Sequence, residues 1–215
     1  MAADSLAPLL RLPYFRAAAR IKIPMIQKSF FIALLFLSSV ALAQDDSVLR
    51  PPKGSTVAIV VFEDLQCPVC RRDSPLEEQA AKTHKVPLIR HDFPLPIHNW
   101  SYKAAVMARY FDTKSKELGD QFRDYIFQHQ PEIIPDNLRT FAEKFAAEHK
   151  VDLPFVIDPQ GKLAAEVNAD RDLGNRLKIN HTPTIYVVSS RNPSQPSVEV
   201  KDSELFQTVE AMQTE

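Results

Sequence analysis

The chain has only two cysteines, Cys67 and Cys70, and two residues separate them. They follow a continuous apolar, β-branched run at 56–62, which is typical of a strand buried on both faces of an α/β sheet. Pro68 suits the first turn of a helix, and helix-forming residues follow it. This order predicts that Cys67 lies at a helix N-terminus, where free backbone N–H groups and the helix dipole stabilise a thiolate, while Cys70 is covered.

Reactivity explains this cysteine pair better than a structural role does. A disulfide across so short a loop removes little chain entropy from the unfolded state, so it would stabilise the fold weakly. A structural zinc site and a two-coordinate copper(I) site are the metal-binding alternatives. Zinc would need two further ligands, and the sequence offers no second cysteine pair and no closely spaced histidine pair. We therefore expect neither a bound metal nor a cofactor.

The N-terminal region has the features of a secretory signal. Residues 29–43 form an apolar block without charge, preceded by Lys28. Small residues at Ala41 and Ala43 match the pattern that signal peptidase accepts. We predict that residues 1–43 are a signal peptide cleaved after Ala43, and that the protein is periplasmic or otherwise extracytoplasmic.

Alternatives to this interpretation concern the start and the fate of the segment. Read from Met25, the signal has ordinary proportions, so Met25 is a candidate true start. A retained membrane anchor and a mitochondrial presequence are the competing interpretations.

Residues 44–215 suffice for a single domain with its own core. The formal net charge of −1 indicates no general attraction to nucleic acid.

The rest of the chain predicts an α/β fold with a helical insertion. Further strands are expected at 86–91, 184–188 and 198–200, followed by a closing helix from Ser203. Apolar residues at helical spacing predict three helices and then a fourth, at 162–177, within an insertion at about 97–178. Aromatic residues of this insertion could line a cofactor or substrate pocket, but core packing is the plainer interpretation.

Three segments together resemble a known family. They are Phe62 to Cys70 with the cysteine pair, His91 to Pro96, and Thr182 to Val188 with a Thr-Pro pair leading into an apolar run. The chain resembles the DsbA-like branch of thioredoxin-fold proteins, which are exported bacterial thiol-disulfide oxidoreductases. The resemblance covers nearly all of 44–215 and implies a thioredoxin-like fold with a helical insertion between the second and third strands.

The resemblance also implies roles for residues far from the cysteines in sequence. Pro183 is expected to follow a cis peptide bond and to pack against the pair. The backbone of Thr182 would then be free to pair with a substrate peptide as an added strand. His181 would lie beside the dithiol, where it either influences the thiolate or fills the turn. The catalytic residues expected from these arguments are Cys67, Cys70, Pro183 and Thr182.

The function that follows is disulfide exchange with protein substrates. We expect an oxidase more than a reductase, acting on secreted proteins with cysteine thiols, and the resemblance implies reoxidation by a membrane quinone-linked partner. Val69 stands where the strong oxidases of the family have a histidine, so a moderate oxidant is predicted. The alternative is a non-enzymatic thioredoxin-like binding protein, such as a copper(I) carrier or a peptide-holding module.

The sequence departs from the family pattern just before the cysteines. Many relatives have a buried carboxylate six residues before the first cysteine, where this chain has Val61. Glu63 and Asp64 lie nearer to the pair. Because the end of a strand more often turns such charges to water, Glu63 is expected to be exposed, and its alternative is an inward position that serves proton transfer. The short stretch after Gln44 leaves no room for a separate dimerisation domain, so a monomer is expected.

Overall fold

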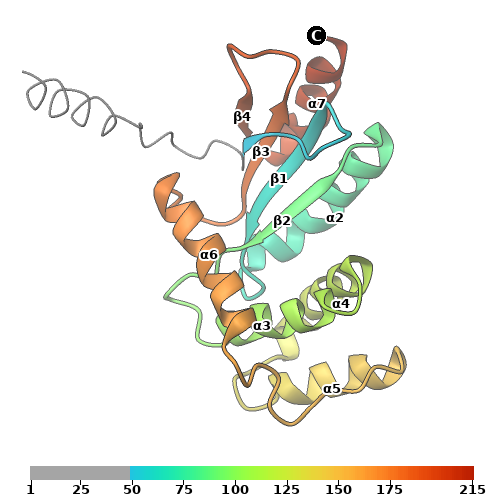
Figure 1. Cartoon of the computed structure of the whole chain (residues 1–215), viewed down its shortest axis with the longest axis vertical. Helices are drawn as coiled ribbons and strands as arrows, with labels where there is room; N and C mark the ends of the chain where they lie inside the picture. Colours follow the sequence, from blue (N-terminus) through green and yellow to red (C-terminus); the bar gives the residue numbers. More distant parts are fainter. Residues whose placement is uncertain (1–48) are drawn as a thin grey trace, which may run out of the picture. The chain divides into compact units, whose positions relative to one another are not determined.

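A computed structural model describes residues 49–215, so the predicted signal peptide, its cleavage site after Ala43 and the alternative start at Met25 lie outside the described residues. The described part forms one four-stranded sheet with helices around it (Figure 1). No helix in it is both long and apolar enough to cross a membrane. Its strands and helices are, in chain order, β1 (Val57–Glu63), α2 (Pro68–His84), β2 (Leu88–Asp92), α3 (Ser101–Asp112), α4 (Lys116–His129), α5 (Leu138–Glu148), α6 (Lys162–Arg176), β3 (Thr184–Ser189), β4 (Ser197–Val200) and α7 (Leu205–Thr214), with short 3-10 helices at Gln130–Glu132 and Asp202–Glu204.

The strand before the cysteines, β1, lies inside the sheet, whose order is β2-β1-β3-β4. It pairs parallel with β2 and antiparallel with β3. Alternate residues of β1 face opposite sides. Val57, Ile59 and Val61 pack with residues of α2 and α7, whereas Ala58, Val60 and Phe62 pack on the side of α6. Both faces are therefore covered, which explains the uninterrupted apolar run.

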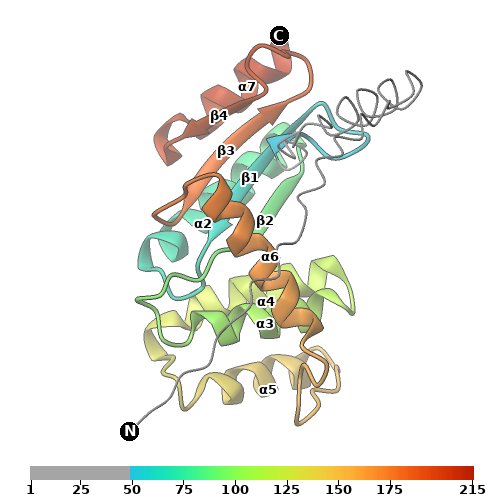
Figure 2. The same cartoon turned by 60° about the vertical axis from the view of Figure 1, so that its left-hand side comes forward.

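The segment between β2 and β3 is helical, as Figure 2 shows from a second side. Its aromatic side chains form a buried cluster that fills the interior of the insertion, and the tilted rings of Phe111 and Phe122 have their centroids 4.5 Å apart. This arrangement agrees with core packing rather than a cofactor pocket. Together with the mixed sheet, it confirms the predicted class, an α/β thioredoxin-like fold with a helical insertion between the second and third strands. The cluster contains Trp100, Phe111, Phe122, Phe141 and Phe145.

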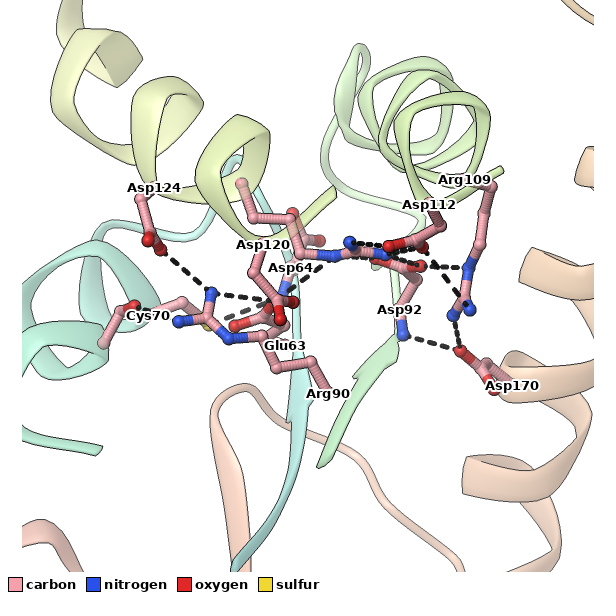
Figure 3. A network of polar contacts seen from close by, with 12 residues as sticks. Glu63, Asp64, Cys70, Arg90, Asp92, Arg109, Asp112, Asp120, Asp124 and Asp170 are labelled. Carbon is pink, nitrogen blue, oxygen red and sulfur yellow. Dashed lines mark hydrogen bonds and ion pairs between the residues drawn. The ribbon is translucent and has the colours of Figure 1, made fainter. Parts of the chain in front are cut away.

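Buried ion pairs hold the insertion against the end of the sheet (Figure 3). Arg123 of α4 is 1% exposed, and its Nη2 lies 3.0 Å from Asp92 Oδ2 at the end of β2 and 2.9 Å from Asp112 Oδ2 of α3. Arg109 of α3 pairs with the same Asp92 and with Asp170 of α6. Asp92 is therefore shared by two arginines, and these pairs connect β2 to α3, α4 and α6.

Candidate active site

The two cysteines lie at the N-terminus of α2, directly after the end of β1. Cys67 is the N-cap residue, with φ −76° and ψ 120°, and Pro68 begins the helix. Both cysteines are free thiols and both are buried, Cys67 to 6% and Cys70 to 1% residual exposure. The structure thus places Cys67 at the positive, N-terminal end of the α2 dipole, and Cys70 lies one helical turn deeper.

The environment separates the acidities of the two thiols. A hydrogen bond from the Cys70 thiol is the largest influence on Cys67, and it lowers the pKa of Cys67 to about 5. Burial opposes this shift, while the side chain of Thr182 and the backbone N–H groups of Cys70 and Val69 add to it. Burial raises the pKa of Cys70 far above that of an ordinary thiol. At neutral pH, Cys67 is therefore a thiolate and Cys70 a neutral thiol.

The Thr182-Pro183 pair lies against the cysteines. Its peptide bond is cis, and the Sγ of Cys67 lies 3.3 Å from the carbonyl oxygen of Thr182. A cleft of about 820 Å³ runs along this segment, with Val69 of α2 and Pro183 in its lining. His181 also lines the cleft, is exposed, and pairs through Nδ1 with Asn180 Oδ1 at 3.0 Å. Thr182 is thus brought to Cys67, whereas Pro183 and His181 line the cleft that runs along the same segment.

The expectation that Glu63 faces water is wrong, because its side chain is buried and the residue is only 2% exposed. The physical reason is a pair of buried arginines: Arg90 Nη1 lies 3.6 Å and Arg123 Nε 3.9 Å from Glu63 Oε1. Burial raises the pKa of Glu63, although both arginines oppose the shift. Glu63 also lies near enough to Cys70 for its charge to raise the pKa of that thiol further. Figure 3 shows the two side chains on the same side of the network.

Asp64, the other acid before the cysteines, organises the loop that carries them. It is 1% exposed. Its carboxylate accepts hydrogen bonds from the backbone N–H of Gln66 and of Leu95, each at 2.7 Å, and lies 2.7 Å from Nδ1 of His98. Its own backbone N–H points to the sulfur of Cys70 at 3.5 Å. These contacts fix the backbone between β1 and α2.

Gln130, in the 3-10 helix after α4, is a site residue that the sequence analysis did not identify. Its Nε2 donates to the carbonyl oxygens of Leu65, at 2.9 Å, and of Cys67, at 3.0 Å. The side chain is buried, so these bonds are shielded from water. Nothing in the local sequence singles out this glutamine, because the carbonyl groups that it binds belong to a loop 63 and 65 residues away.

The described residues gather no group of three or more histidine, cysteine or acidic side chains that could hold a metal ion. The site consists instead of a thiolate at a helix N-terminus, a buried partner thiol and a cis-proline segment beside them. A sheet of order β2-β1-β3-β4 with this dithiol after its first strand defines a thioredoxin-fold protein.

Comparison with known proteins agrees with this class. A thioredoxin family model matches residues 52–199, and the chain belongs to that family. The structure is similar to that of α-DsbA1 from Wolbachia pipientis, with a TM-score of 0.61, 16% identity and coverage of 79% of this chain and 95% of that one. It is also similar to α-DsbA2 from the same organism, described as a thiol-disulfide exchange protein, with a TM-score of 0.59, 21% identity and coverage of 75% and 84%. The DsbA-like resemblance is confirmed at the level of the fold.

A curated relative matches over much of the chain. The Na(+)/H(+) antiporter NhaA 3 of Salinispora tropica is 24% identical over 159 residues, which are 72% of this chain and 24% of the antiporter. The chain therefore spans about a quarter of the length of that relative.

Proposed function

We propose that the protein is a thiol-disulfide oxidoreductase that exchanges disulfides with protein substrates through Cys67 and Cys70. The observation that carries this proposal is the placement of Cys67 at the N-cap of α2 with Cys70 buried one turn deeper, which lowers the pKa of Cys67 to about 5 and raises that of Cys70. A thiolate at a helix N-terminus that leaves readily and a more deeply buried thiol that resolves are the two parts that exchange requires. The description of Wolbachia α-DsbA2 as a thiol-disulfide exchange protein supports the same activity.

The proposed reaction begins with the oxidised protein. A substrate thiolate attacks the sulfur of Cys67, the Cys67–Cys70 bond breaks, and Cys70 leaves as a thiolate that takes up a proton. A second substrate thiolate then attacks the substrate sulfur of the mixed disulfide, which releases the Cys67 thiolate and a substrate disulfide. In the reverse direction, Cys67 attacks and Cys70 resolves. Glu63 is the proposed proton donor and acceptor for Cys70, because it is buried beside that thiol with a raised pKa.

The acidity of Cys67 favours the oxidising direction. A stable thiolate is a good leaving group, so a lower pKa makes the disulfide a stronger oxidant. The Cys67 pKa of about 5 lies between that of thioredoxin, about 7, and that of DsbA, about 3.5. We therefore propose a moderate oxidase, in line with Val69 in place of a histidine.

Substrates are proposed to bind as extended peptides along the cleft beside Pro183. Thr182 directs its carbonyl oxygen to Cys67, so a peptide paired with this backbone would bring its own cysteine to the reactive sulfur. The cleft continues past Val69 toward β4 and offers room for several substrate residues. Thr182 and Pro183 are therefore proposed as binding and positioning residues.

The cellular setting is also part of the proposal. The apolar block at 29–43 supports export by a cleavable signal, and an oxidase of this kind would act outside the cytoplasm. Its partners would be secreted proteins with cysteine thiols and a membrane quinone-linked protein that reoxidises the dithiol. The protein is expected to act as a monomer.

The test measures the reduction potential of the Cys67–Cys70 pair and its activity in oxidative refolding. The full chain is equilibrated in glutathione buffers with trapping of free thiols, and oxidative refolding of a reduced protein is followed. We expect a potential between about −270 and −120 mV, with refolding activity that Cys67→Ser abolishes. A potential near −270 mV together with insulin reduction would instead indicate a reductase. Stoichiometric copper(I) binding with neither activity would support the carrier alternative and overturn the proposal.

A further inference from the structure

A second cleft lies on another side of α2, between this helix and α4. Its volume is about 480 Å³, and Ser74, Glu78, Asp124 and Phe127 contribute to its lining. The cleft shares only Arg72 with the one beside Pro183. A peptide bound along the first cleft would therefore leave the second one open to water.

Arg90 lies beneath this second cleft, where it contacts both Asp124 of the lining and the buried Glu63. The arginine side chain is 2% exposed. Its Nη1 lies 3.6 Å from Glu63 Oε1 on the inner side and 3.2 Å from Asp124 Oδ1 on the outer side. The Asp124 side chain is 33% exposed, so this carboxylate has contact with both the buried guanidinium and solvent. Figure 3 shows the Asp124 side chain pointing toward the guanidinium of Arg90.

The polar atoms between Asp124 and Glu63 form few hydrogen bonds with one another. Both carboxylate oxygens of Glu63, Nη1 of Arg90 and Oδ1 of Asp124 are buried, and none of them makes a well-aligned hydrogen bond with another described residue. Buried polar atoms without protein partners are commonly satisfied by ordered water. A guanidinium does not give up its proton, so a proton passing between Glu63 and Asp124 would need such water alongside Arg90.

The groups that face Asp124 come from three elements. Burial raises the pKa of Asp124, Arg90 of β2 opposes this shift, and a hydrogen bond with Glu78 of α2 and the charge of Glu63 of β1 add to it, which brings the pKa to about 7. Glu78 accepts a hydrogen bond from Arg90 Nη2 as well. Asp120, one turn earlier on α4, forms its ion pair with Lys116, and its charge also raises the pKa of Arg90 and of Glu63. Asp124 can thus change its protonation near neutral pH.

We propose that Asp124 is a positioning residue that connects the buried Glu63–Arg90 pair to solvent, so that the proton of Cys70 leaves and enters through the α2–α4 cleft. This inference rests on the proposed disulfide exchange. It separates the route of the proton from the surface on which the substrate binds. Asp124 belongs to the helical insertion, which would therefore contribute to the chemistry as well as to the fold.

The step served by this route is the attack of Cys70. In a mixed disulfide at Cys67, the Cys70 thiol passes its proton to Glu63, and its thiolate attacks the Cys67 sulfur. The Cys67–Cys70 bond forms, the bond to the substrate breaks, and the substrate leaves with the electron pair as a thiolate. Glu63 then passes this proton through water to Asp124, and Asp124 releases it to solvent. The reverse step supplies a proton to the leaving Cys70.

The experiment isolates this step by stopped-flow reaction of the reduced full chain with dithiobis-nitrobenzoate, a chromogenic aromatic disulfide. The first release of nitrothiobenzoate reports attack by Cys67, and the second reports attack by Cys70 on the mixed disulfide. In Asp124→Asn, we expect the second phase to slow about tenfold near neutral pH and the first to stay within about twofold. The wild-type second phase should level off above about pH 7, and this plateau should be lost in the variant.

Matched variants separate a relay from a structural or general electrostatic effect. Asp120→Asn removes a carboxylate of the same helix whose charge also acts on Glu63 and Arg90 but whose ion pair is with Lys116, so it measures the general electrostatic effect and should leave both phases within about twofold of wild type. Asp124→Glu should restore the second phase. Glu78→Gln keeps the Asp124 carboxylate but removes a group that raises its pKa, so the inflection should move to lower pH; this variant also serves if Asp124→Asn does not fold.

An unchanged second phase in Asp124→Asn, equal slowing of both phases, or equal slowing in Asp120→Asn would overturn the inference. Failure of the proposed function looks different. In that case, the wild-type chain itself would show no second release and no refolding activity.

Discussion

The Sγ of Cys67 lies 3.3 Å from the carbonyl oxygen of Thr182, a residue 115 positions later in the chain. The contact exists because β3, which follows Pro183, pairs antiparallel with β1, which precedes Cys67, in a register that places Thr184 opposite Phe62. The sheet therefore brings the start of one strand to the end of the other. This relationship makes the reactive sulfur and the backbone proposed to bind a substrate parts of one surface.

Replacement of either cysteine should separate the two halves of the reaction. Cys67→Ser should abolish exchange, because Cys70 is buried and remains a neutral thiol. Cys70→Ser should accumulate a mixed disulfide between Cys67 and substrate, since the resolving thiol is gone. Mass spectrometry under non-reducing conditions would detect this adduct. Residual catalysis in Cys67→Ser would contradict the assignment of the nucleophile.

The low pKa of Cys67 should appear in the pH dependence of both reactivity and stability. Alkylation of Cys67 should have its midpoint at about pH 5. Because the folded pKa of Cys67 is below that of the unfolded thiol, the contribution of Cys67 to the stability of the reduced form is fully present above about pH 9 and is lost as the pH falls through about 5. At neutral pH it should be on the order of 2 kcal/mol.

Urea unfolding of the reduced and oxidised protein checks this second expectation. The reduced form should be the more stable one at neutral pH, and the difference should shrink toward pH 5, since a disulfide across so short a loop adds little chain entropy. A difference that does not depend on pH would contradict the lowered pKa.

A histidine at position 69 should make the protein a stronger oxidant. Val69 is 40% exposed and lies next to Cys70 in the first turn of α2, so an imidazole fits there without repacking the core. If Val69→His lowers the pKa of the reactive thiol by about one unit, the potential should become less negative by roughly 30 mV. Equilibration in glutathione buffers measures the shift, and Val69→Ala provides a control that changes the side chain without adding a donor. An equal shift in both variants would argue against the donor explanation.

Removal of Arg123 should destabilise the junction between the sheet and the insertion. Arg123→Met leaves Asp92 and Glu63 buried with fewer compensating charges, so we expect a loss of about 3–5 kcal/mol in the free energy of unfolding. Lys116→Ala, which breaks an exposed pair on the same helix, should cost less than about 1 kcal/mol. Urea denaturation with circular dichroism compares the two, and equal effects would contradict the anchoring role.

The same network predicts an acid-sensitive part of the stability. Burial by itself would raise the pKa of Asp92, but Arg123 and Arg109 hold it below the usual range of an aspartate. A carboxylate with a lowered folded pKa stabilises the fold above its unfolded pKa, and this contribution is lost as the pH falls through the folded value. Asp92→Asn should therefore flatten the decline of stability in acid. A decline as steep as that of the wild type would show that other carboxylates carry it.

Gln130 should matter for the loop that carries Cys67. Gln130→Ala removes the donor for two carbonyl oxygens in a buried place, which should cost about 1–3 kcal/mol of stability. Hydrogen exchange of the 63–70 loop should increase in the same variant, whereas exchange in β3 should stay unchanged. Unaltered protection of the loop would contradict this role.

The local order of the chain determined much of this protein. An uninterrupted apolar run, a cysteine and then Pro68 encode a buried strand followed by a helix, because each signal depends on residues within a few positions of one another. The same short-range periodicity predicts the helices of the insertion. The dithiol and the Thr-Pro segment could therefore be identified as parts of one site from the sequence and its family resemblance.

Tertiary structure alone decided which charges lie inside. Glu63 is buried because Arg90 of β2 and Arg123 of α4 approach it, and strand-end statistics contain no information on such distant partners. Gln130 joins the site for a similar reason, since the loop that it binds is remote in the chain. The cost of burying a charge depends on what compensates it in space. The sequence therefore identifies Cys67 as the reactive cysteine. The polar groups around Cys70, in contrast, are brought there by packing of the insertion against the sheet.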